Sequence, residues 1–173
     1  FLLLLSALSG FCILGAEVIY VRLSGFFLGN RIYAFSILLA VVLILLSLGA
    51  KGSGALLVKM EKRKEEGLAS LLLFSALGIM ASSNLVFLWI SIQSVAESML
   101  PCCETFILLY RFAEAFVLLM PVFLPLGMLF PLTLMLSVRN DEVGRMAGRF
   151  YLSNTAGSVA GSLFFGFYGV RFF

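Results

Sequence analysis

The sequence contains no histidine, one tryptophan and few charged residues, with Asp, Glu, Lys and Arg making up 12% of 173 positions. Without imidazole, histidine-ligated haem or metal sites and Ser-His or Cys-His nucleophilic catalysis are excluded. The three cysteines form no Cys-x-x-Cys pair. We therefore expect no metal, no cofactor and no catalytic residues in this chain.

Apolar residues are in large excess, at 62% of the chain. Soluble domains contain about 45–50% apolar and about 25% charged residues, so this chain could not cover its own core with polar surface. The composition predicts an integral membrane protein whose first partner is the lipid bilayer. A net charge of +3 gives no reason to expect nucleic acid. We interpret residues 1–173 as a single transmembrane domain and a fragment of a longer polypeptide.

Long runs without charge predict membrane-spanning helices, because about 20 apolar residues are needed to cross a hydrocarbon core of roughly 30 Å. No segment alternates as the strands of a membrane β-barrel do. The predicted fold class is therefore all-α integral membrane, a polytopic helical bundle of about five spans. The expected helices lie near residues 2–27, 32–58, 68–93, 105–138 and 147–170.

The fourth predicted helix is longer than one crossing requires, since 34 residues at 1.5 Å each make a rod of about 51 Å. It contains Pro121, Pro125 and Pro131, and each proline removes a backbone donor and opposes the preceding turn. We expect one long helix that is broken by proline, with a partly re-entrant course as an alternative.

Charge bias predicts the orientation, because cytoplasmic loops collect Lys and Arg. The connection 51–66 has five basic residues and 139–149 has three, whereas 94–104 has none. Both basic connections should be cytoplasmic, which requires segment 105–138 to cross once. The chain should then start inside and end outside. Arg22 and Arg31, near the first outer turn, oppose this assignment, but they are two basic residues against the eight in the two basic connections.

Four polar residues are expected at a shared depth in the outer half of the membrane, with Arg22 nearer the outer end of the first span, and each ionised group there costs about 2.5–3.5 kcal/mol on insertion scales. One interpretation is a neutral network of two acids and two bases that locks the helices together, with Glu17 near Arg111 or Arg22 and Glu114 near the remaining arginine. The other is an intramembrane binding or proton-handling site. The residues are Glu17, Arg22, Asn84, Arg111 and Glu114.

Small residues predict where helices pack closely, since close backbone approach drives helix association in lipid. The last predicted helix carries Ser153, Gly157 and Gly161 at four-residue spacing. The first has polar or small residues on one face, and the second ends in a small-residue surface at 49–54. The residues of the face on the first helix are Ser6, Gly10, Glu17 and Ser24.

The cysteines suggest no internal bridge. Cys102 and Cys103 are expected on the outer side, where an oxidising compartment would allow a disulfide, but pairing of adjacent residues strains the geometry. We expect free thiols or one bond to another chain. Cys12, within the first predicted helix, is expected to be inert packing.

Three stretches together resemble the membrane domain of bacterial spermidine synthase-like (polyamine aminopropyltransferase-like) multi-span proteins: residues 9–54, 118–132 and 143–171. The similarity lies in a small-residue opening with Glu and Arg in the first span, a P-x-L-x-G-x-x-F-P-like segment and a G-R-x-Y-x-x-N-T-x-G-x-x-x-G closing helix. By position, these motifs fall on Glu17, Arg22, Gly29, Gly127, Pro131, Gly148, Arg149, Tyr151, Asn154, Thr155, Gly157 and Gly161.

The resemblance implies a membrane domain in the bacterial inner (cytoplasmic) membrane, followed in the family by a further span and, in some members, by a Rossmann-like synthase domain. Neither is found in these 173 residues. The sequence offers no strand followed by a Gly-rich loop of the kind a nucleoside cofactor needs. The resemblance therefore does not predict that this chain is an enzyme.

Two functions are consistent with these features. The first is a non-catalytic membrane subunit or module that packs within a larger membrane protein complex, with other membrane subunits as partners. The alternative is a transport or binding module for a small solute, such as a polyamine, because broken helices and intramembrane charges are typical of transporters.

Overall fold

The structure, a computed structural model of residues 1–173, describes the backbone of residues 1–27, 32–59, 64–99, 104–137 and 143–169. Within these ranges it describes the side chains of residues 1–23, 34–56, 66–86, 106–137 and 143–169. The described residues form no strand and five helices: α1 (Leu2–Phe27), α2 (Ile32–Lys59), α3 (Lys64–Met99), α4 (Glu104–Ser137) and α5 (Val143–Phe167). The all-α prediction is confirmed. The largest difference between the predicted and observed helix bounds is at α3, which begins four residues earlier and ends six residues later than expected.

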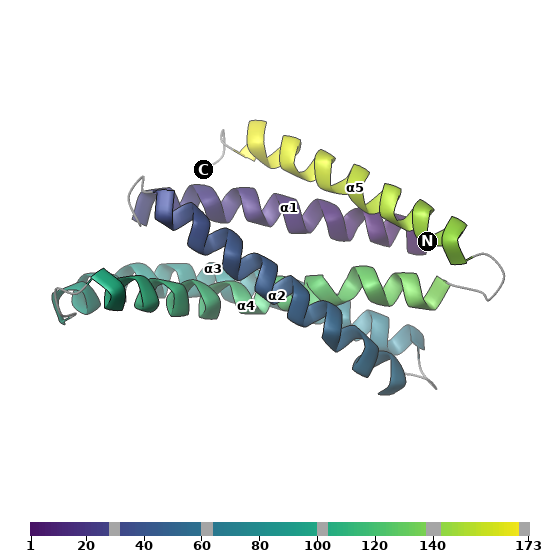
Figure 1. Ribbon diagram of the computed structural model, residues 1–173, viewed down its shortest axis with the longest axis horizontal. Coiled ribbons are helices and arrows are strands. Elements are labelled where there is room, and N and C mark those ends of the chain that lie inside the picture. Colours follow the sequence, from purple (N-terminus) through teal and green to yellow (C-terminus); the bar gives the residue numbers. More distant parts are fainter. Residues whose placement is uncertain (28–31, 60–63, 100–103, 138–142, 170–173) are drawn as a thin grey trace.

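Consecutive helices run in alternating directions (Figure 1), so α1, α3 and α5 are parallel to one another. The ends of α2 and α4 lie at the same end of the bundle as the starts of α3 and α5. The helix termini next to the two basic connections therefore share one end, as expected for a segment 105–138 that runs the length of the bundle once. We call it the basic end.

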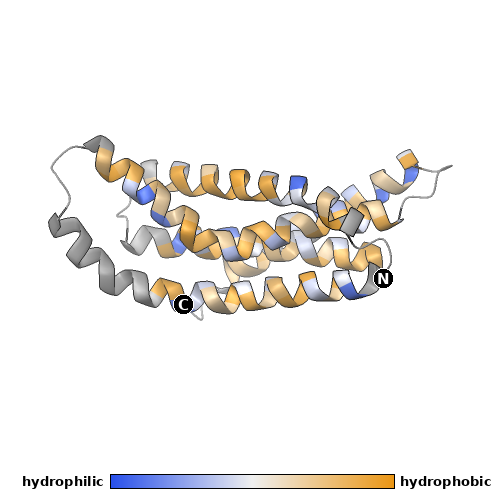
Figure 2. Ribbon diagram, turned by 90° about the horizontal axis from the view of Figure 1, so that it is seen from below, coloured by the Kyte–Doolittle hydropathy of each residue, from blue (hydrophilic) through white to orange (hydrophobic). Residues whose placement is uncertain are grey.

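Four helices contain a stretch long and apolar enough to cross a membrane: Leu2–Leu23, Ala34–Leu56, Glu66–Val86 and Phe106–Ser137. Hydrophobic residues dominate along the bundle (Figure 2). Helix α5 has 25 residues but is not among the four, because Gly, Ser and Asn dilute its apolar side chains. Composition thus identifies four of the five expected spans.

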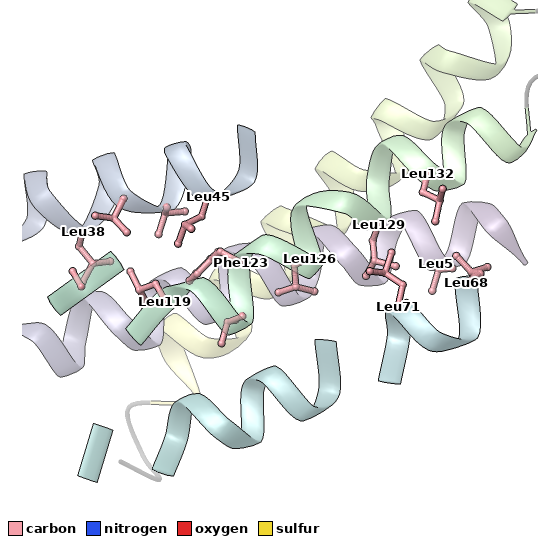
Figure 3. Close-up of a cluster of buried hydrophobic side chains, with 14 residues drawn as sticks. Leu5, Leu38, Leu45, Leu68, Leu71, Leu119, Phe123, Leu126, Leu129 and Leu132 are labelled. Carbon is pink, nitrogen blue, oxygen red and sulfur yellow. The ribbon is translucent and has the colours of Figure 1, made fainter. Parts of the chain in front are cut away.

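The apolar core is built around α4, which contacts every other helix. Leu119, Phe123 and Leu126 of α4 belong to it, together with Leu45 of α2 and with Leu71 of α3, which lies beside Leu129 (Figure 3). Helix α5 contributes nothing to this cluster, and its only buried residues are Phe150 and Gly161. The bundle therefore consists of a core of α2, α3 and α4, with α1 packed beside it and α5 outermost.

The three prolines do not break α4, which is continuous from Glu104 to Ser137. The expected break and the re-entrant alternative are therefore wrong. Pro125 lacks the N–H that would bond the carbonyl of Pro121, four residues earlier. Gly78 of α3 lies directly against that carbonyl oxygen, so a Cα–H group faces the oxygen left without its usual donor. Neighbouring helices commonly compensate for proline inside the membrane in this way.

The arrangement gives a topological prediction. In a cysteine-free background, single cysteines at positions 62 and 140 should be labelled by a membrane-impermeant thiol reagent from the same side, and a cysteine at position 97 only from the other. The reason is that α3 and α4 each run the length of the bundle once. Labelling of position 140 from the same side as position 97 would contradict a single crossing by α4.

Candidate functional site

Helices α1 and α5 lie in direct backbone contact along a parallel pairing. Gly157 lies against the carbonyl oxygen of Ala7, and Gly161 lies against that of Phe11, so a Cβ at either glycine would overlap the α1 backbone. The two contacts share one register, since each α5 residue meets the residue 150 positions before it. Small residues four apart on α5 thus seat it on α1, as is common for close helix pairs in membranes.

Polar side chains of α1 and α5 reinforce this contact. Buried Ser6 donates a hydrogen bond to the carbonyl oxygen of Phe150 at 3.1 Å, and Ser153 donates to that of Leu3 at 2.8 Å. The side-chain oxygen of Asn154 lies 3.3 Å from the hydroxyl of Ser9. Because each bond joins a short side chain to the facing helix, it forms only where the two backbones are close.

The same kind of contact joins α4 to α2 and α3, the two helices with which it has its most extensive contacts. Gly127 lies against the α2 backbone, where its Cβ would come within 2.9 Å of the Cα of Leu46. In return, Gly49 of α2 lies against the carbonyl oxygen of Leu124. Together with Gly78 on Pro121, these contacts place glycines against the facing backbone where α4 packs on α2 and on α3. The small-residue surface expected at 49–54 therefore packs on α4.

Glu17 lies in α1, within the stretch Leu2–Leu23, with its side chain half-buried. Among the residues described, none forms a hydrogen bond or a salt bridge with its carboxyl group. Arg22, one of the two expected partners, donates instead from Nη2 to the carbonyl oxygen of Gly166 at 2.9 Å. The guanidinium thus reaches a backbone oxygen near the last turn of α5, where carbonyls have lost their helical donors.

Asn84 also does not join a shared network. Its side-chain amide donates to the carbonyl oxygen of Met80 on the same helix at 2.8 Å, and the residue is exposed. Arg111 and Glu114 are half-buried in α4, and the hydroxyl of Tyr110 lies 3.5 Å from a carboxylate oxygen of Glu114. Glu17 is therefore not paired with a described basic residue, and Arg22 and Asn84 bond backbone carbonyls instead.

A polar connection that the sequence analysis missed links α1, α3 and α4 at this level. The hydroxyl of Tyr20 is hydrogen-bonded to that of Ser82, and Ser82, fully buried, donates to the carbonyl oxygen of Leu118 at 3.2 Å. A hydroxyl has one proton to donate, so Tyr20 is the donor to Ser82. The signal in the sequence was Tyr20 itself, one turn after Glu17 and on the same side of α1.

The remaining motif positions are structural or exposed. The ring of Tyr151 packs edge-on against Phe130 with centroids 5.8 Å apart, and Arg149 is exposed. Pro131 lies inside α4. Cys12 is a half-buried free thiol. The described residues contain no cluster of side chains suited to bind a metal ion. Gly29, Cys102 and Cys103 lie outside the described residues.

Comparison with known proteins adds no relative: no protein-family model, no curated protein and no solved structure matches this chain. The resemblance to the membrane domain of spermidine synthase-like proteins therefore stays a prediction from the motif residues.

The α1–α5 contact predicts how α5 tolerates substitution. Gly157→Leu or Gly161→Leu should destabilise the bundle by about 1–3 kcal/mol or more, the usual cost of overpacking, because even the first side-chain carbon overlaps the α1 backbone. Asn154→Ala should cost only about 0.6 kcal/mol, the average for a hydrogen bond in a membrane. The measurement is the fraction of monodisperse protein that survives heating in mild detergent.

The matched control is Gly148→Leu, on the same helix, because nothing lies within 4 Å of a Cβ built at Gly148. This variant should survive heating like the unmodified protein. Equal losses for Gly148→Leu and Gly157→Leu would show that helix propensity or solubility, and not the contact with Ala7, determines the outcome.

Proposed function

We propose that the chain is a non-catalytic module of an integral membrane protein in the bacterial cytoplasmic membrane, and that it packs within a larger membrane assembly. The proposal includes five crossings. The fifth crossing is that of α5. It is supported by the contact of α5 with α1, because the two helices run parallel and their backbones touch along most of α5. A helix seated in this way on a spanning helix spans with it, even though its own composition is less apolar.

The observation that carries the proposal is the one-sided packing of α5. Its inner face lies on α1, while the opposite face is open, with Leu152 at 71% and Phe167 at 76% exposure. Ala156 and Ala160 lie between them, exposed and four residues apart. A marginally apolar helix with small residues on its outer face is better covered by another helix than by lipid, because small residues permit close packing.

The proposal predicts an assembly larger than one polypeptide. The native mass of the protein, extracted in mild detergent, should exceed that of a single chain. Ala160→Trp should reduce the larger species, since the indole would hold a neighbouring helix away from α5. Ala40→Trp, at an exposed alanine of α2, is the matched control and should leave the mass unchanged. A native mass equal to that of a single chain would contradict the proposal.

One observation favours a second candidate function, the binding of a cationic solute. Glu17 is a half-buried carboxyl group within a predicted span, and no described residue supplies a positive charge or a donor to it. A protonated amine, such as that of a polyamine, would supply both. Nearby, the hydroxyls of Tyr20 and Ser82 already bond each other and Leu118, so Glu17 is the polar group left for a ligand.

The second candidate is tested by ligand-linked stability. A ligand present at 100 times its dissociation constant stabilises the folded state by about 2.7 kcal/mol, so spermidine should raise the thermal midpoint of the wild type and of Glu66→Gln. Glu66 is an exposed acidic residue at the start of the apolar stretch of α3 and is not one of the predicted intramembrane polar residues. It is the control for non-specific screening of negative charge by spermidine. Glu17→Gln should abolish the rise. A wild-type midpoint that does not respond to spermidine would exclude this candidate and leave the assembly proposal intact.

A further inference from the structure

A groove with a volume of about 620 Å³ runs between α3 and α4 on the outside of the bundle. On α3 it is lined by one helical face between Ser70 and Ala81, and on α4 by one face between Met120 and Met128. Leu56 of α2 closes the groove toward the basic end. The floor is buried and includes Gly78, whereas Phe74 and Leu77 on the rim are 68% and 60% exposed.

The length and position of the groove match one leaflet of a bilayer. Eleven residues separate Ser70 from Ala81, which corresponds to about 16 Å along a helix. Half of a hydrocarbon core of roughly 30 Å is about 15 Å. The groove begins one turn after Glu66, where the apolar stretch of α3 starts at the basic end. It therefore covers the half of the membrane that adjoins the basic end.

The lining of the groove is apolar, which excludes a hydrophilic solute. Ser70 is the one lining residue with a polar side chain, and its hydroxyl donates to the carbonyl oxygen of Gly67 on its own helix at 2.8 Å. The lining therefore offers no free hydroxyl proton, and the Ser70 oxygen is its one hydroxyl acceptor. A polyamine would lose its hydration here and could donate to that single oxygen at most, although buried polar groups need hydrogen-bond partners.

The rim also distinguishes this groove from a helix-docking surface. Where α5 packs on α1 and α4 packs on α2, glycines lie against the facing backbone. Here the large exposed residues are Phe74, Leu77 and Met120, beside the small exposed residues Ser70 and Ala81, and the bulk of the large side chains would keep a helix backbone at a distance. Helices in membranes associate through small residues, whereas a flexible hydrocarbon chain fits between large ones.

The sequence next to the basic end of the groove, where a lipid head group would be, is rich in basic residues. Lys59 follows Leu56 by one turn of α2, and Lys64 precedes Leu71 by two turns of α3, so both positions fall on the helix faces that line the groove. The segment 51–66 has five basic and three acidic residues. Basic residues next to a span attract anionic lipid head groups.

We propose that the groove between α3 and α4 holds one acyl chain of an anionic phospholipid from the leaflet at the basic end, with its head group at the end of the groove that adjoins the basic segment 51–66. The site is separate from the α5 face and from Glu17. It rests on the membrane embedding in the proposed function but not on assembly with other subunits or on solute binding.

The test is native mass spectrometry of the full polypeptide, released from nanodiscs that contain equal amounts of phosphatidylglycerol and phosphatidylethanolamine. We expect one retained phospholipid per chain, with phosphatidylglycerol enriched by about fivefold for each lysine that contacts it. Ala81→Trp fills the groove and should remove the retained lipid. Ala76→Trp, also at an exposed alanine of α3 but outside the groove, should retain it.

The head-group assignment has its own variant. Lys59→Gln combined with Lys64→Gln should keep one lipid per chain and return its composition to that of the nanodisc. Unchanged enrichment in this variant would overturn the assignment.

Equal lipid retention by Ala81→Trp and Ala76→Trp would overturn the groove as the site. Loss of a dimer in Ala81→Trp alone would assign the groove to a second copy of the chain and overturn the proposal. Failure to enter nanodiscs would refute the embedding itself, a result distinct from entry without retained lipid.

Discussion

Direct contact between helix backbones is the constraint on which the bundle depends. Gly157 and Gly161 bring α5 onto α1, Gly127 and Gly49 bring α4 onto α2, and Gly78 brings α3 onto the proline-containing part of α4. In lipid, apolar side chains gain little by meeting one another, so dispersion contacts and short hydrogen bonds between close backbones provide the attraction. Leucine-rich surfaces fill the space between helices, but glycines determine which faces meet.

Close packing also determines which polar groups find partners. Ser6 and Ser153 bond to carbonyls of the facing helix because the two backbones are near enough for a hydroxyl to reach. Gly78 brings α3 near the carbonyl that proline has left without a donor, and Ser82, one turn further on, bonds the carbonyl of Leu118. The long side chain of Arg22 instead reaches a carbonyl oxygen in the last turn of α5. Short side chains therefore join the helices where the backbones are close, and Arg22 satisfies a carbonyl at a helix end.

The sequence alone predicted the helices and their order well, because a run of about 20 apolar residues is typical of a membrane-spanning helix and of few other structures. It predicted small-residue surfaces at 49–54 and at Gly157 and Gly161, but not which helices would face them, since periodicity specifies a face and not its partner. It was wrong about α4, because the effect of proline on a helix depends on whether a neighbour such as Gly78 compensates for the missing donor. The expected pairing of Glu17 with Arg22 or Arg111 is not formed among the described residues. Glu17 and Arg22 are five residues apart on one helix, which at 3.6 residues per turn places them about 140° apart around its axis, and similar depth in a membrane does not determine how α1 and α4 are rotated toward each other.

The pairing of α1 with α5 has a consequence for biosynthesis. The contact of Ala7 with Gly157 joins residues 150 positions apart, whereas α1 makes far fewer contacts with the helix that follows it. At roughly 5–20 residues per second, synthesis of the intervening chain takes about 8–30 s. Throughout that interval Ser6, Ser9 and Gly10 of α1 lack the contacts that they make with α5 in the folded bundle. The first of these five helices to be synthesised thus waits for the last of them to complete its packing, and an insertion factor that shields its small, polar face would act during this delay.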